Sequence, residues 1–325
     1  MALTSEGIIN IPGLMSRWVK LANGANAHYM TAGDTGPAVI LLHGGAAGSS
    51  GTAGWRFMAP FLGANGFRVY CPDQPGFGLA DTRENYWPKD GILSHVEFIH
   101  DFADALCLDE FHIAGNSMGC VNAIHYMLAN PTRVKSFAVI AGHIGNLVAP
   151  ENRPKSLIDI NIFDGSEATM RKLMEYIILD PSMITQDLMD MRVGAGKRQW
   201  ESYQAWFWAF RGRTQAGDPP GPKVTQWLTT KGRLDTLLDI PGIYLYGRKD
   251  VLLPLEYGFA QEDVLPTVQF FYPENTGHQG QTDQPEMFGQ AFLEFFRDGK
   301  VSRKTADWAG VSDRRPELPH LVDQG

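Results

Sequence analysis

The chain has few cysteines, no excess of basic charge and no long apolar run, and each absence excludes a class of protein. The three cysteines in 325 residues, Cys71, Cys107 and Cys120, are too few and too scattered for a disulfide-stabilised secreted scaffold. Aspartate and glutamate outnumber lysine and arginine by 36 to 28, and this acidic balance argues against a nucleic-acid-binding protein. No run approaches the ~18 apolar residues of a membrane span, and the first residues lack the basic and apolar regions of a signal peptide. We therefore expect a cytoplasmic protein that binds neither nucleic acid nor membrane.

Several motifs for metals and cofactors are also missing. The sequence contains no H-E-x-x-H, no phosphate-binding P-loop and no G-x-G-x-x-G, and its nine histidines are scattered. We therefore expect neither a metal nor a cofactor. The composition, with 44% hydrophobic and 20% charged residues, is that of a folded globular protein with a sizeable core.

Short apolar runs alternate with helical stretches through much of the chain. Six runs lack polar alternation, which is typical of strands buried on both faces of a parallel sheet. The spacers between the first four runs are long enough for crossover helices. The pattern predicts an α/β fold with a doubly wound, mostly parallel sheet. The runs are Ala38–Leu42, Phe67–Cys71, Phe111–Ala114, Phe137–Ile140, Ile243–Tyr246 and Val268–Tyr272.

The alternation stops after Gly142 and resumes near residue 240. Between these points the pattern is mainly helical, with Ser166 and Thr185 as expected N-caps and a turn at Ala216–Gly221. The sequence therefore predicts a helical lid over 144–235, inserted between core segments 1–143 and 236–299, and an irregular C-terminal tail over 300–325. The helices expected in the lid are Ser166–Ile178, Ile184–Val193 and Gln199–Arg211.

The pentapeptide Gly115-Asn116-Ser117-Met118-Gly119 is a G-x-S-x-G motif between a predicted strand and a predicted helix. A nucleophilic serine in this context stands on a very tight turn, and the flanking glycines leave room for that turn. The N-terminus of the following helix then favours a developing negative charge. An incidental Gly-Ser turn is the alternative, and the position between strand and helix favours the nucleophile.

Two further residues follow successive predicted strands. Asp250 lies in the loop after the strand near Tyr246, and His278 lies after the next strand. The chain order Ser117, Asp250, His278 is that of an α/β-hydrolase catalytic triad, in which the histidine takes the serine proton and the aspartate orients the imidazole. Taken singly, Asp250 could pair with a neighbouring loop cation, Arg248 or Lys249, and His278 could be a partly buried loop histidine.

A glycine turn follows the strand Ala38–Leu42. It predicts that a backbone N–H of Gly44 or Gly45 helps to bind an oxyanion, with the N–H of Met118 as the second donor. His43 precedes these glycines, and we interpret it as a structural turn residue rather than a catalytic base.

With three motif blocks in this order, the chain resembles the α/β-hydrolase superfamily over about Asn10–Gly299. Within it, the chain resembles the meta-cleavage product hydrolases, which hydrolyse carbon–carbon bonds in the degradation of aromatic and steroid rings. Three stretches carry this resemblance: Gly115–Gly119 with its asparagine before the serine, Asp73–Gly78 after the predicted strand Phe67–Cys71, and the lid segment Leu179–Arg192.

The resemblance implies a mechanism and a set of site residues. The substrate would be a vinylogous diketone acid that tautomerises to its keto form and is then attacked at the ketone, without a cofactor. Arg192, which ends the lid pattern, would bind the substrate carboxylate; the alternative is a solvated arginine paired with Asp187 or Asp190. Such proteins are commonly dimers or larger, so the resemblance also implies a homo-oligomer.

The chain departs from the family pattern at several pocket positions. Gln279 replaces the usual tryptophan after the catalytic histidine, Phe57 replaces an asparagine, and Cys120 replaces a second glycine after the nucleophile motif. The glycine-rich loop at 46–54 is also a few residues longer. We expect Asn116, Phe57 and Gln279 to contact the substrate, in a pocket whose wall is smaller and more polar at Gln279.

These departures keep two other functions open. An ester, lactone or amide hydrolase needs the same triad and oxyanion hole but no arginine for a carboxylate. A ligand-binding protein without turnover is a third hypothesis, because the fold alone does not decide the function.

Overall fold

The computed structural model describes residues 3–144, 156, 158–215 and 239–325. In these ranges eight strands form one sheet in the order β1-β2-β4-β3-β5-β6-β7-β8. The six strands expected from the sequence are present and parallel to one another, which confirms the doubly wound α/β fold. They are β3 (Ala38–Leu42), β4 (Arg68–Pro72), β5 (Phe111–Asn116), β6 (Val134–Ile140), β7 (Gly242–Leu245) and β8 (Val268–Phe271).

The sheet begins with a hairpin that the sequence pattern did not indicate. Strands β1 (Met15–Lys20) and β2 (Asn26–Ala32) pair antiparallel, and β2 pairs antiparallel with β4. Every residue of β1 is exposed or only partly buried, because β1 is the edge strand. An edge strand of this kind carries no continuous apolar run, so the apolar pattern missed it.

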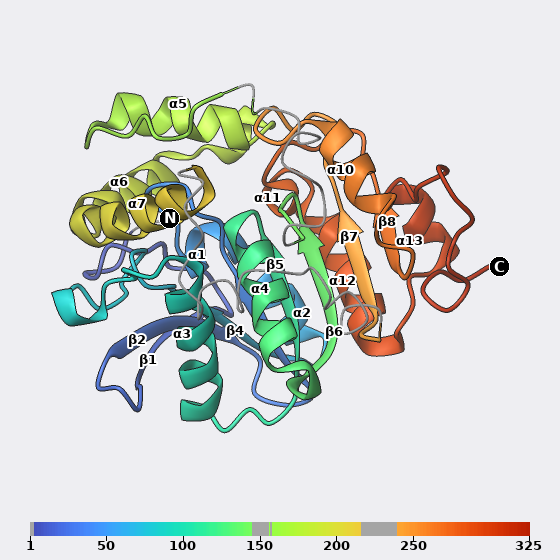
Figure 1. The fold of residues 1–325 in the computed structure, drawn as a ribbon, viewed down its shortest axis with the longest axis horizontal. Helices are drawn as coiled ribbons and strands as arrows, with labels where there is room; N and C mark the ends of the chain where they lie inside the picture. The colour runs from blue at the N-terminus through green and yellow to red at the C-terminus, as the bar shows by residue number, and fades with distance from the viewer. Residues whose placement is uncertain (1–2, 145–155, 157, 216–238) are drawn as a thin grey trace.

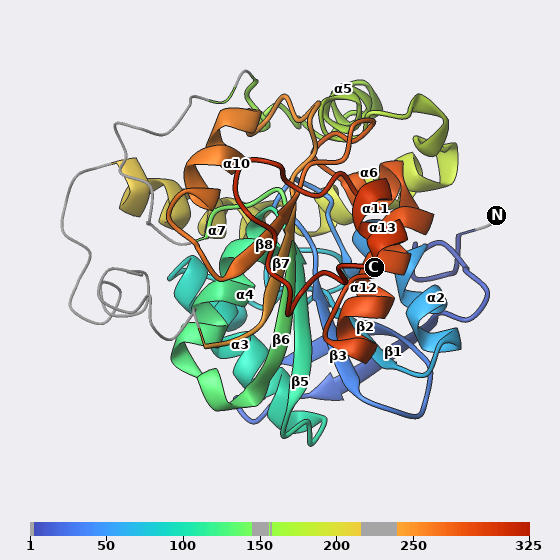
Figure 2. The same ribbon diagram turned by 90° about the vertical axis from the view of Figure 1, so that its right-hand side faces the viewer.

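Helices cover both faces of the sheet (Figures 1 and 2). Figure 2 shows α2 and α12 on one side of the strands, with α3 and α4 on the other. Each layer packs its apolar side chains against the sheet, giving one buried cluster on each face. The core helices are α1 (Gly51–Trp55), α2 (Met58–Ala64), α3 (Ile92–Ala105), α4 (Met118–Ala129), α10 (Leu255–Glu262), α11 (Gly280–Asp283) and α12 (Pro285–Asp298).

Three helices of the insertion lie together beyond one end of the sheet: α5 (Glu167–Ile177), α6 (Gln186–Arg198) and α7 (Trp200–Gln215) (Figure 1). Both predicted caps are confirmed. The side chain of Ser166 accepts from the N–H of Thr169, and that of Thr185 accepts from the N–H of Leu188. The predicted turn Ala216–Gly221 lies outside the described residues.

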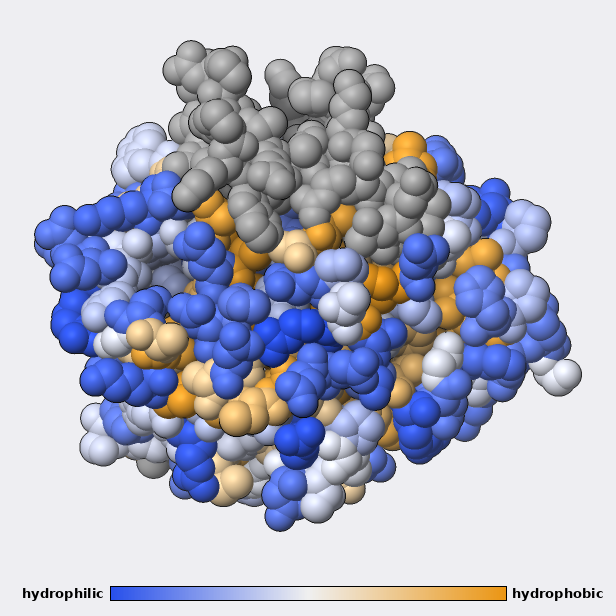
Figure 3. All heavy atoms as spheres, turned by 60° about the horizontal axis from the view of Figure 1, so that its bottom comes forward, coloured by the Kyte–Doolittle hydropathy of each residue, from blue (hydrophilic) through white to orange (hydrophobic). Residues whose placement is uncertain are grey.

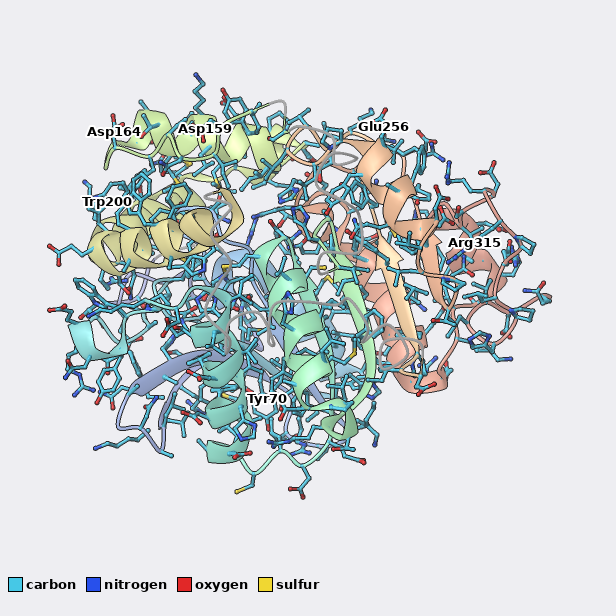
Figure 4. All side chains as sticks on the ribbon, viewed as in Figure 1. Tyr70, Asp159, Asp164, Trp200, Glu256 and Arg315 are labelled. Atoms are coloured by element: carbon cyan, nitrogen blue, oxygen red, sulfur yellow. The ribbon has the colours of Figure 1, made fainter. Side chains whose placement is uncertain are left out.

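The C-terminal tail is not irregular throughout, as we had expected, because it contains α13 (Arg303–Trp308). Ser302 caps this helix, and Thr305 and Ala306 are its buried residues. The tail then runs along the free edge of β8, where the N–H of Tyr272 donates to the carbonyl of Gly310 and the N–H of Ser312 donates to that of Phe270. Arg315, labelled in Figure 4, donates to backbone carbonyls of the same region, including that of Leu265. The tail therefore satisfies backbone groups that an edge strand leaves open.

The surface is mixed in character. On the face shown in Figure 3, hydrophilic residues predominate among the described residues, with apolar residues between them. Among the helices of the described ranges, none is long and apolar enough to cross a membrane.

Candidate active site

Ser117 lies on the turn between β5 and α4, in a conformation that few residues other than glycine adopt. Its backbone angles are φ 57° and ψ −116°, and such strain costs about 1–3 kcal/mol. The N–H of Ser117 donates to the carbonyl of Ile140 at 2.9 Å, which joins the turn to the end of β6. Every other residue from Phe111 to Leu128 is buried, whereas Ser117 is partly exposed. Ser117 is thus the one residue of this buried strand and helix segment that is accessible from outside.

The two motif glycines are required by close backbone packing. A Cβ on Gly115 would overlap the backbone of Gly119, and a Cβ on Gly119 would overlap the carbonyl oxygen of Leu42 at the end of β3. Neither obstacle is a flexible side chain, so neither can move aside cheaply. The spacing G-x-S-x-G therefore follows from the tight approach of α4 to β3 and β5.

Replacing Gly119 by alanine is expected to lower the free energy of unfolding by about 3 kcal/mol or more, because backbone must shift to accept the methyl group. A matched control is Gly194→Ala on α6, where an added Cβ meets nothing within 4 Å. That change is expected to raise stability by up to about 1 kcal/mol, as alanine usually does in a helix. Urea unfolding of both variants measures the difference, and equal stabilities would contradict the packing argument.

Asp250 and His278 are in direct contact. The loop after β7 carries Asp250, the loop after β8 carries His278, and Nδ1 of the histidine lies 2.7 Å from Oδ2 of the aspartate. The other carboxylate oxygen accepts from the N–H groups of Leu252 and Leu253 at 2.8 and 2.9 Å. Both side chains are buried. The carboxylate is thus held by backbone on one side and fixes the imidazole on the other.

The loop cations next to Asp250 have other partners. Arg248 pairs with Glu274 at 3.0 Å, and Lys249 donates to the side chain of Asn275 at 3.1 Å. The alternative, in which Asp250 pairs with Arg248 or Lys249, is therefore not what the structure shows.

The nucleophile turn and the histidine loop meet through Asn116. Its Nδ2 donates to the backbone carbonyl of His278 at 2.9 Å, so the residue before Ser117 supports the residue expected to act as base. Nε2 of His278 is buried and makes no hydrogen bond to any described residue, Ser117 included. Since Nδ1 faces a carboxylate, Nε2 is the nitrogen left to accept a proton. Such bonds often tighten only when substrate binds.

The glycine turn after β3 lies against the nucleophile turn. A Cβ on Gly44 would stand 3.4 Å from Cβ of Ser117, and one on Gly45 would stand 3.0 Å from Cβ of Met118. Met118 is the first residue of α4, so its N–H has no acceptor within the helix. From the lid, Trp206 reaches Gly45, where a Cβ would lie 2.8 Å from its ring. The expected oxyanion donors and the expected nucleophile are therefore neighbours, and Trp206 of α7 lies against Gly45.

Arg192 on α6 is a buried cation without a carboxylate partner among the described residues. Its side chain is 1% exposed, and its one hydrogen bond runs from Nη1 to Oγ of Ser49 at 3.4 Å. Nε is buried and has no hydrogen-bond partner in the part of the chain that the structure describes, and burial lowers the pKa of Arg192 to about 9. The alternative of a solvated arginine paired with Asp187 or Asp190 does not hold, since Arg192 is buried and makes no ion pair with either.

Sequence reasoning missed a second buried arginine. Arg56 follows α1, is 4% exposed, and donates to the carbonyls of Ala53 at 2.8 Å and Met183 in the lid at 3.3 Å. Burial lowers its pKa to about 10, and its charge contributes to the lowered pKa of Arg192. The sequence did offer a signal for this residue. Arg56 is a cation between Trp55 and Phe57, and Phe57 is a position that departs from the family pattern.

The other expected pocket residues occupy different surroundings. Phe57 is partly exposed, and the guanidinium of Arg56 lies 4.3 Å from its ring centre. Gln279 is buried, its N–H donates to the carbonyl of Ile177 on α5 at 2.8 Å, and its Oε1 has no partner among the described residues. Gln279 therefore joins the histidine loop to the lid. Within the described ranges, no group of three histidine, cysteine, aspartate or glutamate residues is placed to hold a metal ion.

The chain is similar in sequence and structure to known hydrolases. Residues 37–171 match the family described as alpha/beta hydrolase fold. A 2-hydroxy-6-oxononadienedioate/2-hydroxy-6-oxononatrienedioate hydrolase of Cupriavidus pinatubonensis is 26% identical over 86% of this chain and 94% of its own length. A 2-hydroxy-6-oxo-6-phenylhexa-2,4-dienoate hydrolase of Burkholderia cepacia is 27% identical over 81% of this chain and 89% of its own. Among solved structures, a meta-cleavage product hydrolase from Pseudomonas fluorescens superposes with a TM-score of 0.69 at 26% identity, covering 87% of this chain and 98% of the other.

Proposed function

We propose that this chain, which has the α/β-hydrolase fold and resembles the meta-cleavage product hydrolases, is a serine hydrolase that cleaves a carbon–carbon bond in a ring-fission product of an aromatic compound. The substrate is a vinylogous diketone acid, the class to which the substrates named for its relatives belong. Ser117, His278 and Asp250 act as nucleophile, proton carrier and orienting carboxylate.

The observation that carries the choice of substrate is the burial of Arg192. A buried cation without an anionic partner is costly, and a substrate carboxylate would compensate it. A neutral ester or amide would leave that charge uncompensated. A carboxylate bound by Arg192 would also sit beside the polar Oγ of Ser49, on the loop that follows β3.

The proposed reaction begins with tautomerisation of the dienol acid to its keto form. Oγ of Ser117 then adds to the ketone carbon while its proton passes to Nε2 of His278, and the carbonyl oxygen becomes an oxyanion held by the N–H groups of Gly45 and Met118. When the carbon–carbon bond breaks, its electron pair enters the conjugated fragment as a dienolate, which takes the proton from His278. Water then hydrolyses the acyl-serine and releases a carboxylic acid. Asp250 holds the imidazole and compensates its transient charge.

The experiment is product identification with purified protein and a yellow 2-hydroxy-6-oxo-dienoate. The proposal predicts loss of the yellow absorbance together with two products in equal amounts, a carboxylic acid from the acyl side and a shorter hydroxydienoic acid. Bleaching without both products, or no bleaching, would contradict carbon–carbon hydrolysis.

Ester, lactone or amide hydrolysis is the second candidate, and Phe57 is the observation that favours it. Its apolar ring occupies a position where the relatives' pattern has a polar side chain, and it lies against Arg56. Rapid release of nitrophenol from a nitrophenyl ester, with dienoates untouched, would support this candidate instead.

We also propose a cytoplasmic, homo-oligomeric enzyme that acts on a small molecule. All three cysteines are free, as expected in a reducing compartment. A dimer or larger assembly is inferred from the family resemblance, and light scattering of the purified protein tests it.

A further inference from the structure

His43, fully buried behind the glycine turn, has both ring nitrogens in hydrogen bonds that fix its tautomer. Nε2 lies 3.0 Å from the backbone N of Gln74, and Nδ1 lies 2.8 Å from the carbonyl oxygen of Gly44. Because a backbone N–H can only donate, Nε2 must accept. The ring hydrogen therefore sits on Nδ1, which donates to Gly44. Burial lowers the pKa of His43 to about 4, so the ring stays neutral in this arrangement at neutral pH.

This bond constrains the peptide that joins Gly44 to Gly45. The peptide unit is planar and trans, so its C=O and its N–H point in opposite directions. When His43 holds the carbonyl of Gly44, it also fixes the plane of that peptide and turns the N–H of Gly45 away from the ring. Two successive glycines have no side chains to fix this plane otherwise, and Gly45 packs against Met118.

A buried chain of side chains connects His43 to the nucleophile helix. Nε2 of Gln74 donates to the carbonyl of His43 at 2.9 Å, and Nδ2 of Asn122 donates to Oε1 of Gln74 at 2.6 Å. Asn122 also donates to Nδ1 of His95 at 2.9 Å, so Nε2 of His95 is the nitrogen that donates to the carbonyl of Pro75. These four polar side chains are all 0% exposed. Asn122 is on α4, four residues after Met118 and so on the same face.

We propose that His43 is a positioning residue for the oxyanion hole, and that Gln74 and Asn122 hold it in register with α4. The helix that supplies the N–H of Met118 thereby also fixes, through Asn122, Gln74 and His43, the direction of the N–H of Gly45. The inference rests on the proposed function only in requiring an oxyanion hole, which ester hydrolysis requires as well.

The test compares His43→Leu with His43→Asn. The amide nitrogen of asparagine can take the place of Nδ1 and donate to Gly44, whereas leucine cannot. Neither residue replaces Nε2, so both variants leave the N–H of Gln74 without its acceptor and share that cost in stability. We expect His43→Leu to lower kcat by about 10²- to 10³-fold with little change in KM, the effect of losing one oxyanion donor. His43→Asn should stay within about tenfold of the unchanged protein, at a similar Tm.

Each variant is assayed with both a ring-fission dienoate and a nitrophenyl ester. Equal kcat values for the two variants at equal Tm would overturn the positioning role. A kcat difference on the ester, with dienoates untouched by every form of the protein, would support the positioning role while rejecting carbon–carbon hydrolysis. If His43→Leu does not fold, Gln74→Met, which keeps the backbone N–H and the ring, replaces it. A loss in kcat without a change in KM is again expected, and unchanged kcat would overturn the inference.

Discussion

Ser117→Ala is expected to lower kcat for a ring-fission dienoate by about 10⁴- to 10⁶-fold, the range typical of removing the nucleophile from a serine triad. The hydroxyl is the only group that the proposed mechanism attaches to the substrate. The backbone strain at this position remains, since alanine at φ 57° is also disfavoured. Stability should therefore change little. Stopped-flow absorbance at the dienoate maximum, together with thermal unfolding, measures both quantities.

A suitable control is Ser182→Ala, an exposed serine in the lid. It loses the same hydroxyl at an exposed position and should keep kcat within about twofold. Near-normal turnover by Ser117→Ala, at any pH, would reject the serine mechanism. A slow spectral change that stops before product appears would instead fit tautomerisation without cleavage, and would leave the nucleophile assignment intact.

Arg192→Met is expected to raise KM for a dienoate by at least about 30-fold, since truncating one partner of a buried charge pair costs about 2–5 kcal/mol. Methionine fills much of the arginine volume without its charge. The unliganded protein should be as stable as before or more stable, because the substitution removes a buried cation that has no carboxylate partner in the described residues. Turnover of a neutral nitrophenyl ester should stay within a fewfold, because that substrate offers Arg192 no charge.

Lys197→Met is the matched control, since it removes one positive charge from an exposed position on the same helix. Its KM for the dienoate should be nearly unchanged. If Arg192→Met loses activity equally on both substrates, the substitution has disturbed the packing of the lid. An unchanged KM for the dienoate would contradict the proposal that Arg192 binds the substrate carboxylate.

The sequence predicted the parallel part of the sheet because its buried strands are continuous apolar runs. Every residue of β3 and β5 is buried, and a strand covered on both faces must be apolar throughout. β1 has no continuous apolar run because its residues are exposed or only partly buried. α13 was not predicted because it is short and lies in a polar segment. The caps Ser166 and Thr185 were predictable because each acts within one turn of its own helix.

Some features of the candidate site could likewise be predicted from the sequence, and others could not. Ser117, Asp250 and His278 each follow a strand, and the carboxyl ends of parallel strands meet at one edge, so their order along the chain was informative. The contact between Asp250 and His278 had to come from the structure. The structure also had to supply three other facts, because each depends on residues distant in sequence: Arg192 has no carboxylate partner among the described residues, Arg56 donates to the carbonyl of Met183, and Gln74 donates to His43.

The central claim is that this serine hydrolase is built for a carbon–carbon bond in a carboxylate substrate. The most direct measurement is the ratio of kcat/KM for a 2-hydroxy-6-oxo-dienoate to kcat/KM for a nitrophenyl ester, on one preparation. The account predicts a ratio far above one that depends on both Ser117 and Arg192. A ratio below one, with ester release that requires Ser117 but not Arg192, would contradict it and identify an ester hydrolase.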